Sequence, residues 1–429
     1  MPNLLARAAA AVAPARLGSS YRWLLASTIV TNVGDGFALA AGPLLVASQT
    51  HDPLIVSMAA LAQRLPVLLF GAIAGTVADR VDRRRVIIAV NLARAAVLAV
   101  LAAVIATGVV SIPLVLVSLF ALGAAEVFAD VTSSSVLPRL VQRSDYGIAN
   151  SRLQGGHLLA NQLVAPPIGA FLFVVGMALP FAADAVAFLL GALLVSRVVL
   201  SPATLSRDGG PDAATPGWRA QMAEGIQWLA AHPPMRTLAI TIFLFNVTFG
   251  AAWSVLVLYA TERLGMSAVG YGLLTTAMAV GGLFGVALYG RLERRFSLAD
   301  IMRVGLLIET ATHLVFALTT SAAVVLVTSA VFGAHAFVWG TTSTVVRQRA
   351  VPDELLGRVT GVYFTGSVLG HVIGVPIGGL VARQFGITAP FWFAFIGSAL
   401  LVAVMWRRFD AIVHAGDIHA PPEGVAAGS

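Results

Sequence analysis

The chain of 429 residues has no cysteine and no lysine, and only 11% of its residues are charged. The lack of cysteine excludes disulfides, thiolate metal sites and cysteine nucleophiles, and the lack of lysine excludes Schiff-base chemistry. A typical soluble domain is about 25% charged. The hydrophobic share of 58% excludes disorder. So large an apolar fraction must face lipid, so the composition predicts a polytopic membrane protein.

Signatures of catalysis are missing from the sequence as well. It contains no Walker loop, no H-E-x-x-H, no G-x-S-x-G and no paired metal-ligand cluster. We therefore predict no enzymatic activity, no cofactor and no bound metal. The net charge of +7 does not indicate nucleic acid, because excess arginine in a membrane protein usually marks its cytoplasmic loops.

Long apolar stretches between charged or Gly/Pro-rich segments predict twelve transmembrane helices, six on each side of a polar segment. The predicted fold class is an all-α membrane protein with two six-helix bundles. The predicted spans lie near 22–48, 54–78, 84–107, 112–136, 148–175, 178–198, 236–261, 268–290, 299–319, 322–346, 357–382 and 388–406.

Five regions follow from these spans. They are a cytoplasmic tail (1–21), a first bundle (22–199), a cytoplasmic linker (200–235), a second bundle (236–408) and a cytoplasmic tail (409–429). A cleaved signal peptide is the less favoured alternative for the first region, because its apolar run is short. Within the linker, Trp218, Met222, Ile226 and Leu229 recur at helical spacing. They predict an amphipathic helix at the inner membrane interface, although the linker could also serve only as a spacer.

The distribution of arginine predicts the orientation. With the N-terminus inside, 23 of the 27 arginines fall in inside segments and only Arg263 and Arg383 in outside loops. Both termini are therefore expected in the cytoplasm of a protein of the cell membrane. The inside arginines would meet anionic lipids at the cytoplasmic face.

The two halves resemble each other when shifted by 209 residues. Residues 125–128 then align with 334–337, and Pro167-Ile168-Gly169 aligns with Pro376-Ile377-Gly378. Shorter matches at slightly larger shifts occur in the same order along the chain. A duplicated six-helix unit gives parallel halves related by an axis along the membrane normal. The alignment places Glu126 and His335 at equivalent positions.

Residues 75–85 carry a recognisable motif, with Gly75, Asp79, Arg80, Asp82 and Arg83 at its key positions. It resembles the loop 2–3 signature of the major facilitator superfamily, G-x-x-x-D-R-x-G-R-R/K, and departs from it at Asp82. The form D-R-x-D-R-R is similar to the drug:proton antiporter branch, which includes macrolide and siderophore exporters.

Other features fit that branch or depart from it. Asn32, Gly34 and Asp35 in the first span and Leu65-Pro66 in the second fit it, and the resemblance extends over the whole chain. The span 5 motif is degraded to residues 165–170, and Leu119 stands where the span 4 motif has an arginine. The resemblance implies a transporter with alternating access, and the departures weaken the case for the usual proton relay.

The loop motif also has a direct physical interpretation. A carboxylate at Asp79 can bind a helix N-terminus, where backbone N–H groups and the dipole favour negative charge. The resemblance implies that the start of span 11, near Gly357 and Arg358, is its partner. We predict that this contact holds the inner gate shut in one state. The simpler alternative is that the arginines only set topology.

Ionisable residues near the bilayer midplane are costly and usually functional. The spans place Asp35, Arg64, Glu126, Glu309, His335 and His371 there. Asp35 and Glu126 are predicted to carry protons, because carboxylates in an apolar cavity can bind and release protons near neutral pH. Arg64 is their predicted counter-ion and His335 a further proton acceptor. The alternatives are a static ion pair and, for His335, an interhelical hydrogen bond. Glu309 and His313 are assigned to support of the fold.

Aromatic and amide side chains within the spans predict the substrate cavity, which would suit a large amphiphilic molecule. The candidates are Asn32, Phe37, Gln63, Asn161, Gln162, Asn246, Phe249, Trp253, Phe337, Trp339 and Tyr363.

The sequence as a whole predicts a secondary transporter that exports a drug, antibiotic or siderophore in exchange for protons and acts as a monomer. An importer or uncoupled facilitator is one alternative. A membrane scaffold or sensor is another, but it would not require so many ionisable groups at the midplane.

Overall fold

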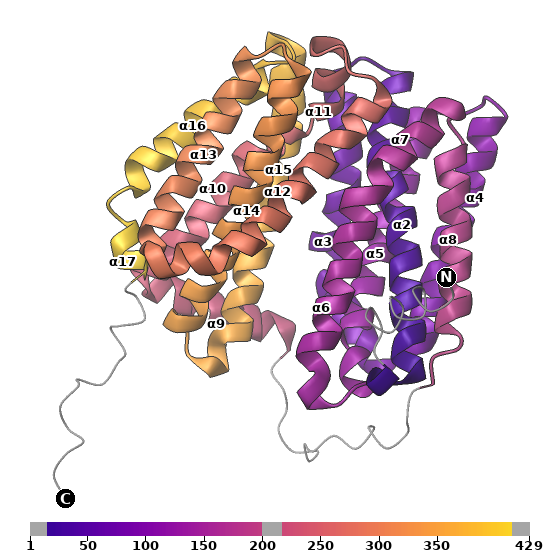
Figure 1. Ribbon diagram of the computed structural model, residues 1–429, viewed down its shortest axis with the longest axis horizontal. Helices are drawn as coiled ribbons and strands as arrows, with labels where there is room; N and C mark the ends of the chain where they lie inside the picture. Colours follow the sequence, from indigo (N-terminus) through magenta and orange to yellow (C-terminus); the bar gives the residue numbers. More distant parts are fainter. Residues whose placement is uncertain (1–14, 200–216, 414–429) are drawn as a thin grey trace, which may run out of the picture. The chain divides into compact units, whose positions relative to one another are not determined.

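A computed structural model describes residues 15–199 and 217–413. It describes only the backbone of Ala72, residues 76–80 and Ser134. Nearly all of the described residues are helical, and none forms a strand (Figure 1). The predicted tails outside 15–413 and linker residues 200–216 lie outside the described residues.

The chain divides into two compact units. Of the described residues, 15–199 and 257–276 belong to the first unit. Its long elements are α2 (Gly18–Gln49), α3 (Pro53–Arg80), α4 (Arg83–Ala106), α5 (Ile112–Ser134), α6 (Tyr146–His157), the π-helix η4 (Leu158–Val164), α7 (Ala165–Val175), α8 (Leu179–Val195) and the π-helix η6 (Tyr259–Arg263).

Of the described residues, 217–256 and 277–413 belong to the second unit. Its elements are α9 (Trp218–Ala231), α10 (Pro233–Trp253), α13 (Leu298–Leu318), α14 (Ala322–Ala350), α15 (Asp353–Phe385), α16 (Ala389–Met405) and the short α17 (Phe409–Val413). Two helices cross the division of the chain: α11 (Leu256–Leu258) and α12 (Ala268–Arg295).

The twelve predicted spans are confirmed within the described residues. Ten helical segments are long and apolar enough to cross a membrane, and the shorter apolar helices α8 and α16 complete the set. The predicted span 148–175 is divided into α6, η4 and α7. Pro166 and Pro167 supply the physical reason, because proline has no N–H to donate to the preceding turn.

Helix α9 forms where the amphipathic pattern predicts a helix, and it packs along α15. At Gly225 an added Cβ would lie 2.9 Å from the carbonyl oxygen of Arg358. Only glycine allows this close approach of the two helices. The neighbouring Glu224 forms an ion pair of 2.5 Å with Arg358, and Leu229 is buried in the apolar core of the second unit. The linker therefore contains a helix that is part of the folded second unit.

Candidate functional site

Three charged side chains from three helices meet inside the first unit. Arg94 of α4 donates a hydrogen bond to Oδ1 of Asp35 on α2. Asp184 of α8 lies beside them. Arg94 is 5% exposed and Asp184 is 1% exposed, while the Asp35 side chain is 21% exposed. We call these three residues the buried charge cluster.

Gly34 creates the space that Asp184 occupies. A Cβ added at Gly34 would lie 2.0 Å from Oδ1 of Asp184, far closer than any real contact. Within the described chain this Oδ1 has no hydrogen-bond partner. The glycine before Asp35 thus lets a second carboxylate approach the first span, at the cost of an unsatisfied buried oxygen.

The Arg94 guanidinium also lies over the ring of Phe188, 4.0 Å from its centroid. A cation over an aromatic face is attracted by the ring quadrupole, more so where water is excluded. Asp35 and Phe188 thus hold the guanidinium, while its Nε has no hydrogen-bond partner in the described chain.

Further acids surround the cluster. Glu126 and Asp130, one turn apart on α5, are close enough to act on Asp35 and Arg94 electrostatically. Both are more exposed than the three cluster residues. Acidic groups therefore outnumber the one guanidinium, so the site can take up positive charge.

The prediction that Arg64 is the counter-ion of Asp35 is wrong. Arg64 on α3 is exposed, and Asp35 pairs instead with Arg94. The sequence places both arginines within spans, but spacing along separate helices does not reveal which side chain turns inward. Asp184 was missed altogether, although an acid within an apolar span is the signal that identified Asp35.

The predicted cavity residues of the first unit contact several of its helices. Asn32 contacts Nδ1 of His157 through its Oδ1, at 2.7 Å. The backbone of Asn161 lies against Gly36 of α2. Gln63 approaches Gly42 from α3, and Phe37 packs its backbone on Gly169. These side chains are half-buried.

The second unit has its own buried polar group. Nε2 of His313 lies 2.8 Å from Oε1 of Glu309, and Nε2 of His335 lies 3.5 Å from Oε2 of the same carboxylate. Glu309 and His313 are fully buried, and His335 is 5% exposed. The acid that His335 contacts is thus Glu309, on α13 of its own unit. This contact between α14 and α13 agrees with the alternative of an interhelical contact for His335.

Several predicted cavity residues of the second unit pack against other aromatic or charged side chains of that unit. Phe249 and Trp253 stack on each other and on Phe332. The Tyr363 hydroxyl lies 2.7 Å from Oγ of Ser343. The Arg347 guanidinium lies over the Tyr363 ring, 3.9 Å from its centroid.

Two further predicted cavity residues lie elsewhere in that unit. Asn246 donates to the carbonyl of Ile242 in its own helix, and Phe337 is 41% exposed.

The loop motif lies where α3 ends and α4 begins. Asp82 is the N-cap of α4, and its Oδ1 accepts from the backbone N–H groups of Arg84 and Arg85. Arg84 donates to the carbonyl of Ser196. The side chains of Asp79 and Arg80 lie outside the described residues. The structure thus gives Asp82 a local role that glycine cannot supply through a side chain.

A family model described as a transmembrane secretion effector matches residues 9–420. The chain belongs to this family of major facilitator transporters. The family membership confirms the predicted resemblance, and it makes the chain a multi-pass membrane transporter with a small-molecule substrate.

Relatives and solved structures agree with this family. The chain is 28% identical over 380 residues to the multidrug efflux pump Tap of Mycolicibacterium fortuitum, covering 86% of this chain and 90% of that protein. It is 24% identical to the uncharacterized MFS-type transporter YfiS of Bacillus subtilis, covering 86% of this chain and 88% of that protein.

Two solved structures share the fold. The nucleoside transporter NupG matches with a TM-score of 0.69 at 13% identity, covering 92% of this chain and 99% of that one. A bacterial homologue of the iron transporter ferroportin also matches with a TM-score of 0.69, at 18% identity, covering 91% of this chain and 98% of that one. These likenesses show the major facilitator fold.

Proposed function

We propose that this transporter exports a drug-like amphiphilic molecule in exchange for protons. The family and the Tap relatives support efflux of a drug. The observation that carries the proton coupling is the buried charge cluster, in which Asp35 and Asp184 share one guanidinium.

Charge balance explains how the cluster would couple. Two ionised carboxylates and one guanidinium leave one net negative charge in a region that excludes water, which is unfavourable. Uptake of one proton neutralises the cluster, and release of that proton restores the attraction to Arg94. Glu126 and Asp130 can pass protons between the cluster and water, because they are exposed and lie near it.

The cell membrane is the proposed location, with both termini in the cytoplasm. The arginine distribution supports this orientation. It places the loop motif at the cytoplasmic face, where Asp79 would act as the gating latch and the arginines would contact anionic lipid. The protein would act as a monomer, since each chain carries a full set of twelve spans.

Transport into inverted membrane vesicles tests the proposal. Dyes, antibiotics and siderophores are offered with and without an acidic vesicle interior, so that protons leave the vesicle as the substrate enters. Efflux predicts accumulation inside the vesicles that collapses when an ionophore dissipates the gradient. Accumulation in right-side-out vesicles instead would favour the importer, and equal flux with and without a gradient would favour the uncoupled facilitator.

Two variants connect the result to the cluster. Asp35→Asn removes one of the two acids and should abolish gradient-driven accumulation while leaving downhill flux. Glu262→Gln is the matched control, because Glu262 is an exposed acid of the first unit that pairs with His51 and belongs to neither the cluster nor the loop motif. Normal uphill transport by Asp35→Asn would remove the cluster from the coupling mechanism.

A further inference from the structure

His157 ends α6 and directly precedes the π-helix η4. It lies within a spanning segment, Arg143–Val175, where ionisable residues are costly and usually functional. Short π-helical stretches within α-helices also occur often at functional sites. The His157 ring is half-buried in the same unit as the buried charge cluster, and the proton exchange proposed above does not yet involve it.

Asn32 of α2 determines which nitrogen of this ring carries the hydrogen. Nδ2 of Asn32 donates to the carbonyl oxygen of Thr28 at 2.7 Å, so Oδ1 is the amide atom that faces the ring. That oxygen can only accept, and it lies 2.7 Å from Nδ1 of His157. Nδ1 therefore carries the hydrogen of the neutral imidazole, and Nε2 is the nitrogen with a free lone pair.

Nε2 is also the accessible nitrogen of the His157 ring. Among the described residues, His157 forms its hydrogen bond through Nδ1, and Nε2 is not one of the enclosed atoms that lack a partner. Because the residue is only half-buried, Nε2 can exchange a proton with water or with a neighbouring acid. The ring thus presents an unprotonated nitrogen that a proton can reach.

The charges on the neighbouring helices favour a proton at His157. Glu126 of α5 is close enough to act on the ring electrostatically. On α2, Asn32 lies one turn before Asp35, which pairs with Arg94 of α4. A protonated ring would therefore lie beside one carboxylate and be held by the helix that carries the cluster acid Asp35.

The other elements packed on α6 and η4 bring no competing positive charge to the ring. The sequences of η4 and α7 contain no charged residue. On α6 itself Arg152 lies on another face, since five residues turn a helix by about 140° beyond one full turn. The charged residues of η2 (Leu137–Arg139) and η3 (Arg143–Asp145) pack at the other end of α6, with Asp145 about 18 Å along the helix from His157.

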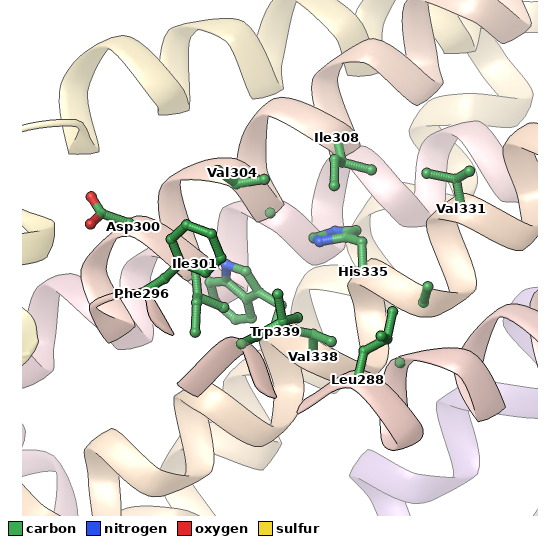
Figure 2. A pocket seen from close by; sticks show the side chains of 14 residues that line it. Leu288, Phe296, Asp300, Ile301, Val304, Ile308, Val331, His335, Val338 and Trp339 are labelled. Atoms are coloured by element: carbon green, nitrogen blue, oxygen red, sulfur yellow. The ribbon is translucent and has the colours of Figure 1, made fainter. Parts of the chain in front are cut away.

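His335 of the second unit differs from His157 in its surroundings. Figure 2 shows its ring in an apolar pocket of that unit, where Ile308 and Val331 are among the lining residues. Both of its ring nitrogens are buried. Of these two histidines, His157 is the one that presents an accessible ring nitrogen.

We propose that His157 carries the exchanged proton at Nε2 together with Glu126, and that Asn32 is the positioning residue that keeps Nε2 free in the neutral ring. This rests on the proton exchange of the proposed function. Protonated Glu126 gives its proton to Nε2, which leaves a carboxylate beside an imidazolium, and the return of the proton restores the neutral pair. One proton is thus held beside the buried charge cluster without an unpaired charge.

NMR of the full chain in phosphatidylcholine nanodiscs, with isotopically labelled histidine, tests the site without any substrate. His157→Gln identifies the resonances of the His157 ring nitrogens. We expect the neutral ring to carry its hydrogen on Nδ1 and to gain a second hydrogen on Nε2 between about pH 5 and 8. Glu126→Gln should shift the midpoint of this titration to lower pH, because the imidazolium loses a neighbouring negative charge.

Variants of Asn32 test its positioning role through the same resonances. Asn32→Leu removes the acceptor, so the neutral ring should shift toward the tautomer with its hydrogen on Nε2. Asn32→Asp retains a side-chain oxygen at that place and should keep the hydrogen on Nδ1. An unchanged tautomer in Asn32→Leu would contradict the positioning role.

Transport connects the site to coupling. For a compound that the wild type accumulates in inverted vesicles, His157→Gln should lower gradient-driven accumulation about tenfold or more. It should also remove the pH dependence between about pH 5 and 8 at a fixed gradient, with downhill flux retained. His51→Gln is the matched control, because His51 is an exposed histidine of the same unit that pairs with Glu262.

This proposal and the proposed function can fail separately. A neutral ring with its hydrogen on Nε2, or a ring that does not titrate between about pH 5 and 8, would overturn the site at His157. Normal uphill transport by His157→Gln with an unchanged pH profile would overturn its role in coupling and leave the proposed function standing. Wild-type accumulation that ignores the proton gradient would refute the proposed function, while NMR still decides the site. If His157→Gln does not fold, His157→Asn gives the same comparisons.

Discussion

The hydroxyl of Thr276 donates a hydrogen bond of 2.8 Å to the carbonyl oxygen of Leu163. In a regular α-helix that oxygen would accept from residue 167, but Pro167 has no N–H. Both residues of the hydrogen bond belong to the first unit. Thr276, from the start of α12, thus satisfies a backbone group that proline leaves without its helical donor.

Thr276→Val should destabilise the protein by about 0.5–2 kcal/mol, because the Leu163 oxygen loses a partner where water is scarce. Thermal unfolding in detergent measures the change. Thr310→Val is the control, since its hydroxyl bonds only the Leu306 carbonyl of its own helix. Equal melting temperatures for the two variants would show that the Leu163 oxygen finds another donor.

Removal of the Arg94 guanidinium should strongly reduce both stability and transport. Arg94→Met leaves the buried Asp184 and the partly buried Asp35 without a counter-ion, and breaking a buried pair costs up to about 3–5 kcal/mol. Purified Arg94→Met should unfold at lower temperature and lose transport, whereas Arg64→Met should retain both, because Arg64 is exposed. A stable Arg94→Met protein with full transport would contradict the central role of this ion pair.

Gly34→Ala tests the close approach of Asp184 to α2. The added methyl group would overlap Oδ1 of Asp184, so the variant should lose stability and transport. Gly71→Ala in α3 is the matched control, because an added Cβ there meets nothing within 4 Å and alanine is the better helix former.

A second change separates the clash from other effects of Gly34→Ala. Combination with Asp184→Ala removes the carboxylate and should restore thermal stability but not uphill transport. A Gly34→Ala protein as stable as Gly71→Ala would show that the two helices separate at little cost.

The cap at Asp82 predicts a graded response. Asp82→Ala should cost about 0.5–2 kcal/mol, whereas Asp82→Gly should cost only a few tenths. The glycine variant matches the wider superfamily pattern, so its transport should be close to normal. Thermal unfolding and vesicle uptake measure both effects. A larger loss in Asp82→Gly than in Asp82→Ala would mean that the side chain does not act as a cap.

Sequence patterns located the spans because lipid imposes a local requirement on each segment. A stretch such as 84–107 must be apolar over about 20 residues whatever its neighbours are, and the structure has α4 at Arg83–Ala106. The same holds for the amphipathic helix at Trp218–Ala231, whose pattern is also local. The family followed from the short loop motif at residues 75–85.

The site depended on how the helices rotate and pack. Asp35 could be identified as a candidate from its position in a span, but its partner Arg94 lies 59 residues away and Asp184 lies on the sixth span. The internal repeat aligned His335 with Glu126, but it could not show that His335 contacts Glu309 of the neighbouring helix α13. Arg64 and Arg94 both lie within predicted spans, and only their burial in the structure distinguishes them.

The sequence by itself therefore determined the membrane location, the twelve helices and the transporter family, because each depends on composition or on a contiguous pattern. The tertiary structure decided which charges meet. A buried charge needs a partner within a few ångströms, and which side chains come that close depends on how the helices pack, as at Gly34, where the missing Cβ admits Asp184. These contacts between helices are encoded by shape, which a linear pattern does not reveal.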